Sequence, residues 1–290
     1  MTELDDLSRE VRRRAAAGTG YSLPLVPDAG LVASRMIAPT RLEKTIYTPF
    51  YCLVLAGRKK VHLGERAIDF TPGEGVIVSH HLPVLARVEE ASLARPYLAL
   101  AMELDIDLLR SLAEGTANGA EAAEPISAGR ATPGLVGAFG RLAALTDDAG
   151  ARAVLAPLLR TEIHFHLLRS GHGAMLRRLT RVDSHASRIA RAIAEIRRGF
   201  AGPLRVADLA AAAGMSASSF HEHFRAVTAT TPIGFQKDLR LAEARRLLAS
   251  GSHSVGTVAH MVGYESPTQF SREYARAFGQ PPRNDLRGAA

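Results

Sequence analysis

The sequence predicts a multidomain α+β fold, in which a domain of short β-strands and a helical hairpin precedes an all-α domain. Short segments of β-compatible composition alternate with glycine and proline turns in residues 31–103. Helical spacing of apolar residues replaces them after Asp105. A helix-turn-helix pattern then occurs twice in the last third of the chain. We therefore expect one domain over residues 1–182 and a second over residues 183–290.

The composition is typical of a globular protein. The 290 residues suffice for two domains with separate cores, and 47% are hydrophobic against 22% charged. A single cysteine, Cys52, excludes a disulfide framework and favours a cytoplasmic location. No segment approaches the run of about eighteen apolar residues that spans a membrane. Residues 1–18 lack the apolar core of a secretory signal, so we expect a charged surface helix there and no membrane association.

Seven short segments are predicted to be strands. Turn signals such as Gly57-Arg58 and Gly64-Glu65 separate them. Many short strands with frequent turns favour a small antiparallel barrel or sandwich, and a small barrel encloses a pocket for one small ligand. The segments are residues 31–37, 50–55, 59–63, 66–70, 75–79, 84–91 and 97–103.

Helices are predicted after the strands. Residues 113–129 are rich in Gly, Ala and Glu and indicate a surface excursion or mobile loop. Residues 135–145 and 151–168 have helical spacing and predict a hairpin that packs against the barrel. One side of the second helix carries Leu155, Leu158, Leu159 and Ile163. Because such a pair commonly forms a dimer seam, the sequence allows a homodimer.

Residues 255–287 have the layout of a helix, a glycine turn and a second helix. Gly263 breaks the first helix where a positive φ allows a sharp turn, and Pro267 suits the first turn of the second. The first helix has the stripe Val255, Val258, Ala259 and Val262, and the second has Phe270, Tyr274 and Ala277. A polar outer face on the second helix is typical of a DNA-reading helix-turn-helix.

Residues 206–232 repeat this plan. Gly214 corresponds to Gly263, and Ser216 to Ser266. The apolar stripe also recurs, as Val206, Leu209, Ala210 and Ala213, followed by Phe220 and Phe224. Repetition of stripe, turn and cap indicates one supersecondary unit used twice. Between the copies, residues 232–249 predict a helix that is apolar on two sides, long enough to hold two recognition helices about one turn of DNA apart.

The positive charge is concentrated with the repeat. From Ser184 onward there are 14 Lys and Arg against 8 Asp and Glu, so this part carries +6 of the net charge of +7. A local positive field suits a polyanion, because neutralising phosphates releases counterions.

Two resemblances agree with this interpretation. Residues 262–282 (VGYESPTQFSREYARAFGQPP) and 240–248 (RLAEARRLL) are similar to the second recognition helix and bridging helix of AraC/XylS-type transcription regulators. Residues 50–79, 82–84 and 91–100 resemble the cupin-like N-terminal domain of one subgroup. The resemblance implies sequence-specific binding to double-stranded DNA and sensing of a small-molecule effector by the barrel. It also implies transcriptional activation through contacts with RNA polymerase.

The resemblance also suggests which residues contact DNA. Arg272 is the strongest candidate, because arginine can bind guanine O6 and N7 with two hydrogen bonds. Glu222 departs from the basic or amide residue common at its position, and Pro267 brings no donor. Ser216 and Ser266 are expected to cap the recognition helices, whose N-termini often lie near phosphates. The expected DNA-binding set is Ser216, Ser218, His221, Glu222, Arg225, Ser266, Pro267, Thr268, Gln269 and Arg272.

The sequence also contains candidates for metal and cysteine chemistry. His62, His80 and His81 could ligate a metal, but their spacing lacks the H-x-H…E pattern of cupin enzymes, so we expect no metal. Cys52 in an apolar segment reads as a small buried hydrophobe rather than a reactive sensor. No phosphate-binding glycine loop or serine elbow occurs.

We therefore predict an effector-controlled transcription regulator without catalytic activity or cofactor. Two alternatives stay open at this point. One is a metal-dependent cupin enzyme fused to a DNA-binding module, and the other is a regulator controlled without a small ligand.

Overall fold

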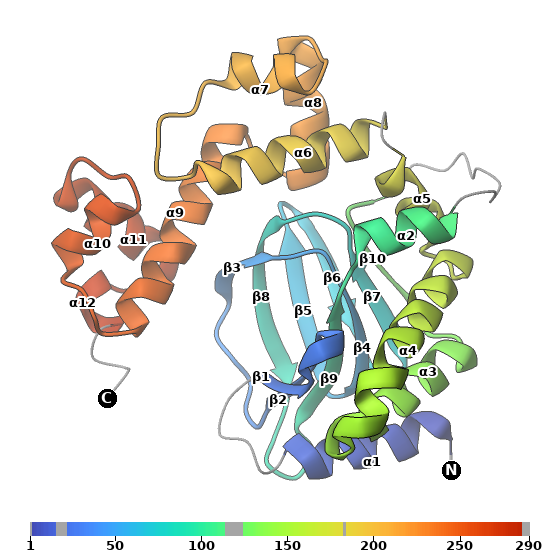
Figure 1. Cartoon of the computed structure of the whole chain (residues 1–290). Coiled ribbons are helices and arrows are strands. Elements are labelled where there is room, and N and C mark those ends of the chain that lie inside the picture. Colours follow the sequence, from blue (N-terminus) through green and yellow to red (C-terminus); the bar gives the residue numbers. More distant parts are fainter. Residues whose placement is uncertain (1, 16–21, 114–123, 182–183, 286–290) are drawn as a thin grey trace.

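A computed structural model of the chain describes residues 2–15, 22–113, 124–181 and 184–285. An N-terminal domain of strands and helices lies beside a domain built of helices alone (Figure 1). The predicted multidomain α+β class is confirmed. In the described part of the chain no helix is both long and apolar enough to cross a membrane.

The described strands of the N-terminal domain form two antiparallel sheets. One has the strand order β1-β2-β9-β4-β7-β10, and the other β3-β8-β5-β6. No ladder joins them within the described residues, so they face each other as a sandwich rather than closing into one hydrogen-bonded barrel. The strands are β1 (Ser22–Val26), β2 (Leu31–Met36), β3 (Glu43–Tyr47), β4 (Phe50–Ala56), β5 (Arg58–Leu63), β6 (Arg66–Phe70), β7 (Glu74–Val78), β8 (Leu82–Glu90), β9 (Tyr97–Glu103) and β10 (Ile126–Arg130).

Alternation along the strands separates two cores. On β4, Cys52 and Val54 point between the sheets, whereas Tyr51 and Leu53 point toward the helices. The space between the sheets is filled by side chains such as Phe70, which is buried. The second core lies between the six-stranded sheet and helices α1 (Glu3–Ala15), α2 (Ile106–Ala113), α3 (Pro133–Ala144), α4 (Ala149–Arg169) and α5 (Gly173–Thr180).

The predicted helical hairpin is confirmed, but its apolar side is placed differently. Helices α3 and α4 lie side by side against the six-stranded sheet (Figure 1). Ile163 is buried and Leu159 packs against the core. Leu155 and Leu158 are exposed, so the four residues expected on one side of the helix do not form one buried stripe. The helix is 21 residues long, and its apolar residues cover more of its circumference than the sheet can bury.

Three strands, β1, β3 and β10, were not predicted from the sequence. Strand β1 contains Pro24 and lies at the edge of its sheet, where a missing backbone donor is tolerated. Strand β3 has no fully buried residue and therefore little apolar signal. Strand β10 falls in the stretch expected to be a loop, and is held by pairing with the distant β7. Residues 114–123 of that stretch lie outside the described residues.

The C-terminal domain contains two helix pairs joined by a long helix. The first core includes Phe220, Phe224 and Phe235, and the second includes Phe270 and Tyr274. The joining helix contributes to both, with Phe235 in the first and Leu241 in the second, as predicted. The helices are α6 (His185–Arg198), α7 (Val206–Ala212), α8 (Ala217–Thr228), α9 (Pro232–Ala249), α10 (Val255–Met261), α11 (Pro267–Phe278) and α12 (Pro282–Asp285).

Polar contacts join the two domains. Lys44 Nζ on β3 lies 2.5 Å from Asp238 Oδ1 on α9. Arg245 on α9 also donates to Glu43, across 3.1 Å. His80 Nε2, after β7, also lies 3.0 Å from the Ala186 carbonyl oxygen of α6. The helical domain thus rests on one end of the two sheets.

Candidate nucleic-acid interface

The first helix pair consists of α7 and α8. Gly214 adopts φ +62° and turns the chain between them, and the Met215 amide donates to the Ala210 carbonyl oxygen at 3.0 Å. Ser216 Oγ accepts a hydrogen bond from the Ser219 amide at 3.3 Å, so its predicted capping role is confirmed. With the phenylalanines of α8 buried, the opposite face of this helix is open to solvent.

The second pair, α10 and α11, has the same construction. Gly263 adopts φ +86° at the turn, which confirms the positive φ predicted there. Ser266 Oγ accepts from the Gln269 amide at 3.3 Å and caps α11. Pro267 occupies the first turn of this helix, where its missing N–H leaves no hydrogen bond unmade.

The residues predicted to contact DNA lie on the outer surfaces of α8 and α11. Ser266 is partly exposed, and the others are exposed: Ser216, Ser218, His221, Glu222, Arg225, Pro267, Thr268, Gln269 and Arg272. Each helix therefore presents a largely polar, solvent-exposed surface.

The relative placement of the two pairs depends on Arg240 of the bridging helix α9. Its guanidinium donates to the carbonyl oxygens of Phe200, Gly202 and Gly263, at 2.7, 2.9 and 2.9 Å. It also donates to Ala201 across 3.1 Å. Residues 200–202 precede the first pair and Gly263 lies in the turn of the second, so one side chain connects both. Four carbonyl acceptors around one cation form a strong, directional set.

Gln236, one turn before Arg240, reinforces the connection. Its Nε2 donates to the carbonyl oxygens of Phe200 at 3.0 Å and Gly202 at 2.8 Å. The loop between α6 and α7 is thus held against α9 by two neighbouring side chains. Sequence periodicity missed both residues, because they are polar positions between the two apolar rows of α9. Gln236 is almost fully enclosed, but this burial is visible only in the structure, so no sequence signal identified the two residues.

A second network orients Gln269 on α11. Its Nε2 lies 3.5 Å from Glu273 Oε1. Glu273 also accepts from the Tyr264 hydroxyl at 2.8 Å and pairs with Lys237 of α9 at 3.1 Å. Partial burial opposes ionisation of Glu273, but the hydrogen bonds from Tyr264 and Lys237 outweigh it and lower the pKa of this carboxyl. An ionised Glu273 can therefore hold the Gln269 amide group from the inner side of the helix.

Two models of known protein families match the chain. A family model for the N-terminus of AraC-type transcriptional regulators matches residues 28–175, and a helix-turn-helix domain model matches residues 209–288. The chain belongs to the AraC-type transcriptional regulators. Membership of this family agrees with the DNA-binding layout expected from the repeated helix pair.

Individual relatives of this AraC-type regulator match over shorter stretches. It is 35% identical over 66 residues to the transcriptional activator RhaS of Pectobacterium carotovorum. It is 38% identical over 77 residues to the RCS-specific transcriptional activator RclR of Escherichia coli. These matches cover 23% and 27% of this chain and 24% and 27% of those proteins. The chain thus spans about a quarter of the length of these curated relatives.

Solved structures of ToxT from Vibrio cholerae share the whole architecture. The apo form of one ToxT variant has a TM-score of 0.60 and 9% identity, covering 90% of this chain and 98% of ToxT. Wild-type ToxT bound to an unsaturated fatty acid has a TM-score of 0.58 and 10% identity, covering 89% and 93%. At this identity the likeness shows the fold alone.

The histidines that could ligate a metal by residue type have other surroundings in this AraC-type regulator. His80 is buried, with Nδ1 2.7 Å from Ser79 Oγ, and its Nε2 carries the proton because it faces a carbonyl oxygen. Burial lowers the pKa of His80 to about 4. Among the described residues, no group of three or more His, Cys, Asp or Glu side chains could hold a metal ion.

His221 and His223 point in different directions, as their spacing predicts. His221 is exposed on the outer face of α8. His223 stacks on His185 of α6, with ring centroids 3.9 Å apart. Only His221 is therefore placed on the surface of the helix that could face DNA.

Cys52 is buried between the sheets, as expected for a small hydrophobe. Burial raises the pKa of its thiol to about 11, so the thiolate is scarce at neutral pH. Reactive cysteines have the opposite property, a lowered pKa together with exposure.

Proposed function

We propose that this AraC-type regulator binds a specific promoter sequence by inserting α8 and α11 into successive major grooves. The observation that carries the proposal is the fixed pair of capped, outward-facing helices joined through Arg240. The bridging helix α9 has 18 residues, or about 27 Å at 1.5 Å per residue. That length suits two grooves on one side of a duplex, which lie about 34 Å apart.

The two recognition helices contribute differently in this proposal. On α11, Arg272 reads a guanine, while Thr268 and Gln269 contact neighbouring bases. On α8, Ser218 and His221 contact bases weakly, and Glu222 accepts from a cytosine amino group or keeps a phosphate away. Arg225 contacts the sugar-phosphate backbone of the DNA. The helix N-termini capped by Ser216 and Ser266 approach DNA phosphates. Direct readout is therefore concentrated in the second helix pair.

We also propose that the protein activates transcription through contact with RNA polymerase. Two relatives, RhaS and RclR, are named transcriptional activators. The net positive charge of the helical domain supports tight DNA binding, which an activator needs to hold polymerase at a promoter.

Control by a small molecule is part of the proposal. ToxT, which shares this fold, has been solved with an unsaturated fatty acid bound. An effector that contacts one arrangement of the two domains better than another would shift the population of DNA-competent molecules. The polar contacts between β3 and α9 are of the kind that such a shift would make or break.

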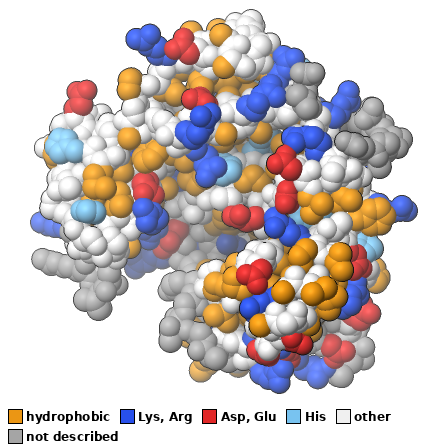
Figure 2. All heavy atoms as spheres, viewed as in Figure 1, with side chains coloured by type: hydrophobic (Ala, Val, Ile, Leu, Met, Phe, Trp, Pro, Cys, Tyr) orange, Lys and Arg blue, Asp and Glu red, His pale blue; other side chains and the backbone are white. Residues whose placement is uncertain are grey.

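A homodimer formed through α4 completes the proposal. Val154, Leu158 and Phe165 are 65%, 63% and 44% exposed, and with Thr161 they recur at spacings of four, three and four residues. Figure 2 shows hydrophobic side chains gathered over α4. This spacing is the seam of a coiled coil, and an exposed stripe of that kind favours a second copy of the same helix.

The function is tested by selecting bound sequences from a random DNA pool with the purified full chain. We expect an enriched motif with two blocks about ten base pairs apart, centre to centre. The recovered motif, placed upstream of a reporter gene, should raise transcription when the protein is expressed. Recovery of no motif, with binding that depends on salt alone, would overturn the proposal.

A further inference from the structure

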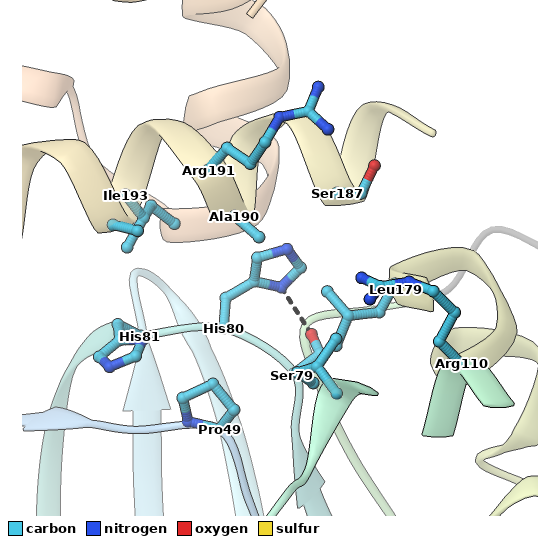
Figure 3. A pocket seen from close by; sticks show the side chains of 12 residues that line it. Pro49, Ser79, His80, His81, Arg110, Leu179, Ser187, Ala190, Arg191 and Ile193 are labelled. Carbon is cyan, nitrogen blue, oxygen red and sulfur yellow. Dashed lines mark hydrogen bonds between the residues drawn. The ribbon is translucent and has the colours of Figure 1, made fainter. Parts of the chain in front are cut away.

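A cavity of about 310 Å³ lies between the two domains (Figure 3), and no residue of α8 or α11 lines it. Helix α6 of the helical domain forms one wall with Ala190, Ile193 and Ala194. Pro49 and the Ser79, His80 and His81 loop of the N-terminal domain form the opposite wall, and Ile106, Arg110 and Leu179 close the side. The cavity therefore has walls from both domains.

The lining is apolar around a few polar groups. Pro49, Ile106, Leu179 and Ile193 offer aliphatic surface. None of the residues that line the cavity is Asp or Glu. Arg110 and Arg191 both belong to the lining. The surroundings therefore favour a molecule that carries a negative charge on an apolar body.

Arg110 is placed to bind that charge. Its Nε donates to the Thr180 carbonyl oxygen at 3.3 Å, and its Nη1 to Asp107 at 2.5 Å. These bonds orient the guanidinium beside Leu179 and leave Nη2 without a hydrogen bond to the described residues. Asp107 is 90% exposed, so water screens its charge strongly.

His81 adds a neutral donor. Burial, with the nearby Arg197 and His80, lowers the pKa of His81 to about 4, so the ring is uncharged at neutral pH. No hydrogen bond joins its ring nitrogens to the described residues. A carboxylate bound by Arg110 could therefore leave His81 for a second polar atom of the same molecule.

We propose that this cavity is the effector site and that it takes a small organic carboxylate with an apolar body. Its volume lies at the lower end of the range of about 300–1,000 Å³ for small-molecule sites. Because both domains form the walls, a bound molecule stabilises the arrangement in which they enclose it. Helix α6 packs against α8 through the shared core, which links occupancy of the cavity to the first recognition helix. This inference rests on the proposed function.

The test uses 2-naphthoate as probe and the full-length chain. The chain has no tryptophan, so naphthoate fluorescence is measured against little protein background. We expect saturable binding, at least tenfold weaker binding of the uncharged 2-naphthamide, and a change in affinity for the selected DNA motif. Arg110→Gln should weaken naphthoate binding about tenfold, and Ala190→Leu, which fills the cavity from α6, should abolish it.

Arg141→Gln is the matched control, because Arg141 is also a half-exposed helical arginine paired with one carboxylate, Glu162. It should bind naphthoate like the unmodified protein. Equal binding by the Ala190→Leu variant, or no binding of naphthoate or the smaller benzoate at millimolar concentration, overturns the site. If the unmodified chain selects no DNA motif in the absence of any probe, that result instead contradicts the proposed function.

Discussion

The guanidinium of Arg240 and the carbonyl oxygen of Gly263 are joined by a hydrogen bond of 2.9 Å, which connects the bridging helix to the turn of the second helix pair. The same side chain binds the loop before the first pair. The spacing of the two recognition helices therefore depends on a polar side chain as well as on the two apolar cores.

Arg240→Met should uncouple the helix pairs while keeping an aliphatic stem. Loss of one hydrogen bond from a charged donor costs about 1.5–3 kcal/mol of stability, and buried carbonyl oxygens stay unpaired. We expect a lower urea midpoint and a larger loss of affinity for a two-block DNA motif than for a single block. Arg246→Met is the control, since among the described residues the Arg246 guanidinium pairs only with Glu243 on the same helix. Equal effects of the two substitutions would contradict the coupling.

Gly263→Ala should be much more damaging than Gly251→Ala. Both glycines have positive φ, so both substitutions strain the backbone by about 1–2 kcal/mol. An added Cβ meets nothing within 4 Å at Gly251, but would lie 2.1 Å from the Ala201 carbonyl oxygen at Gly263. The second turn must therefore move away from residues 200–202. Thermal unfolding and DNA affinity measure the difference. Similar losses in the two variants would show that the Ala201 carbonyl moves away from the added methyl group at little cost.

Arg272→Ala should relax base preference at one position of the motif. If Arg272 binds a guanine with two hydrogen bonds, its loss removes about 1–3 kcal/mol of discrimination there. Arg272→Lys keeps the charge but not the paired geometry, so it should also lose the preference. Competition binding with motif variants measures this. Full recovery by lysine would identify Arg272 as a phosphate contact.

Leu158→Glu should dissociate the homodimer proposed through α4. A buried, unpaired carboxylate on each side of a two-fold seam opposes association strongly. Light scattering should show a dimer for the unmodified chain and a monomer for the variant. Leu93→Glu is the control, because Leu93 is 74% exposed in the β8–β9 loop, away from α4. A monomeric unmodified protein would refute the seam.

His80→Gln should reduce the amount by which the free energy of unfolding falls at acidic pH. The pKa of His80 is about 4 in the folded protein, below its ordinary value of 6.5. The neutral ring therefore contributes stability that is complete above pH 6.5 and is lost as the pH falls toward 4. The slope from this one group is about 1.4 kcal/mol per pH unit. Glutamine can still donate to Ala186, so urea denaturation at pH 7 and 5 should show a smaller difference in the variant.

The sequence determined the elements whose physics is local. Helix stripes, positive-φ glycines and serine caps depend on residues within one or two turns of each other, and Gly214, Gly263, Ser216 and Ser266 all have the predicted geometry. Most strands were also recognisable, because alternation and turn residues are short-range signals. The family followed from the same local motifs.

Only the tertiary structure decided the relationships between distant residues. Pairing of β10 with β7, the outward direction of Leu158 and the hydrogen bonds of Arg240 depend on which surfaces meet. The cavity beside Arg110 exists because α6 rests on the end of the sheets. A one-dimensional pattern records what each residue can do, whereas its partner is chosen by packing of the whole chain.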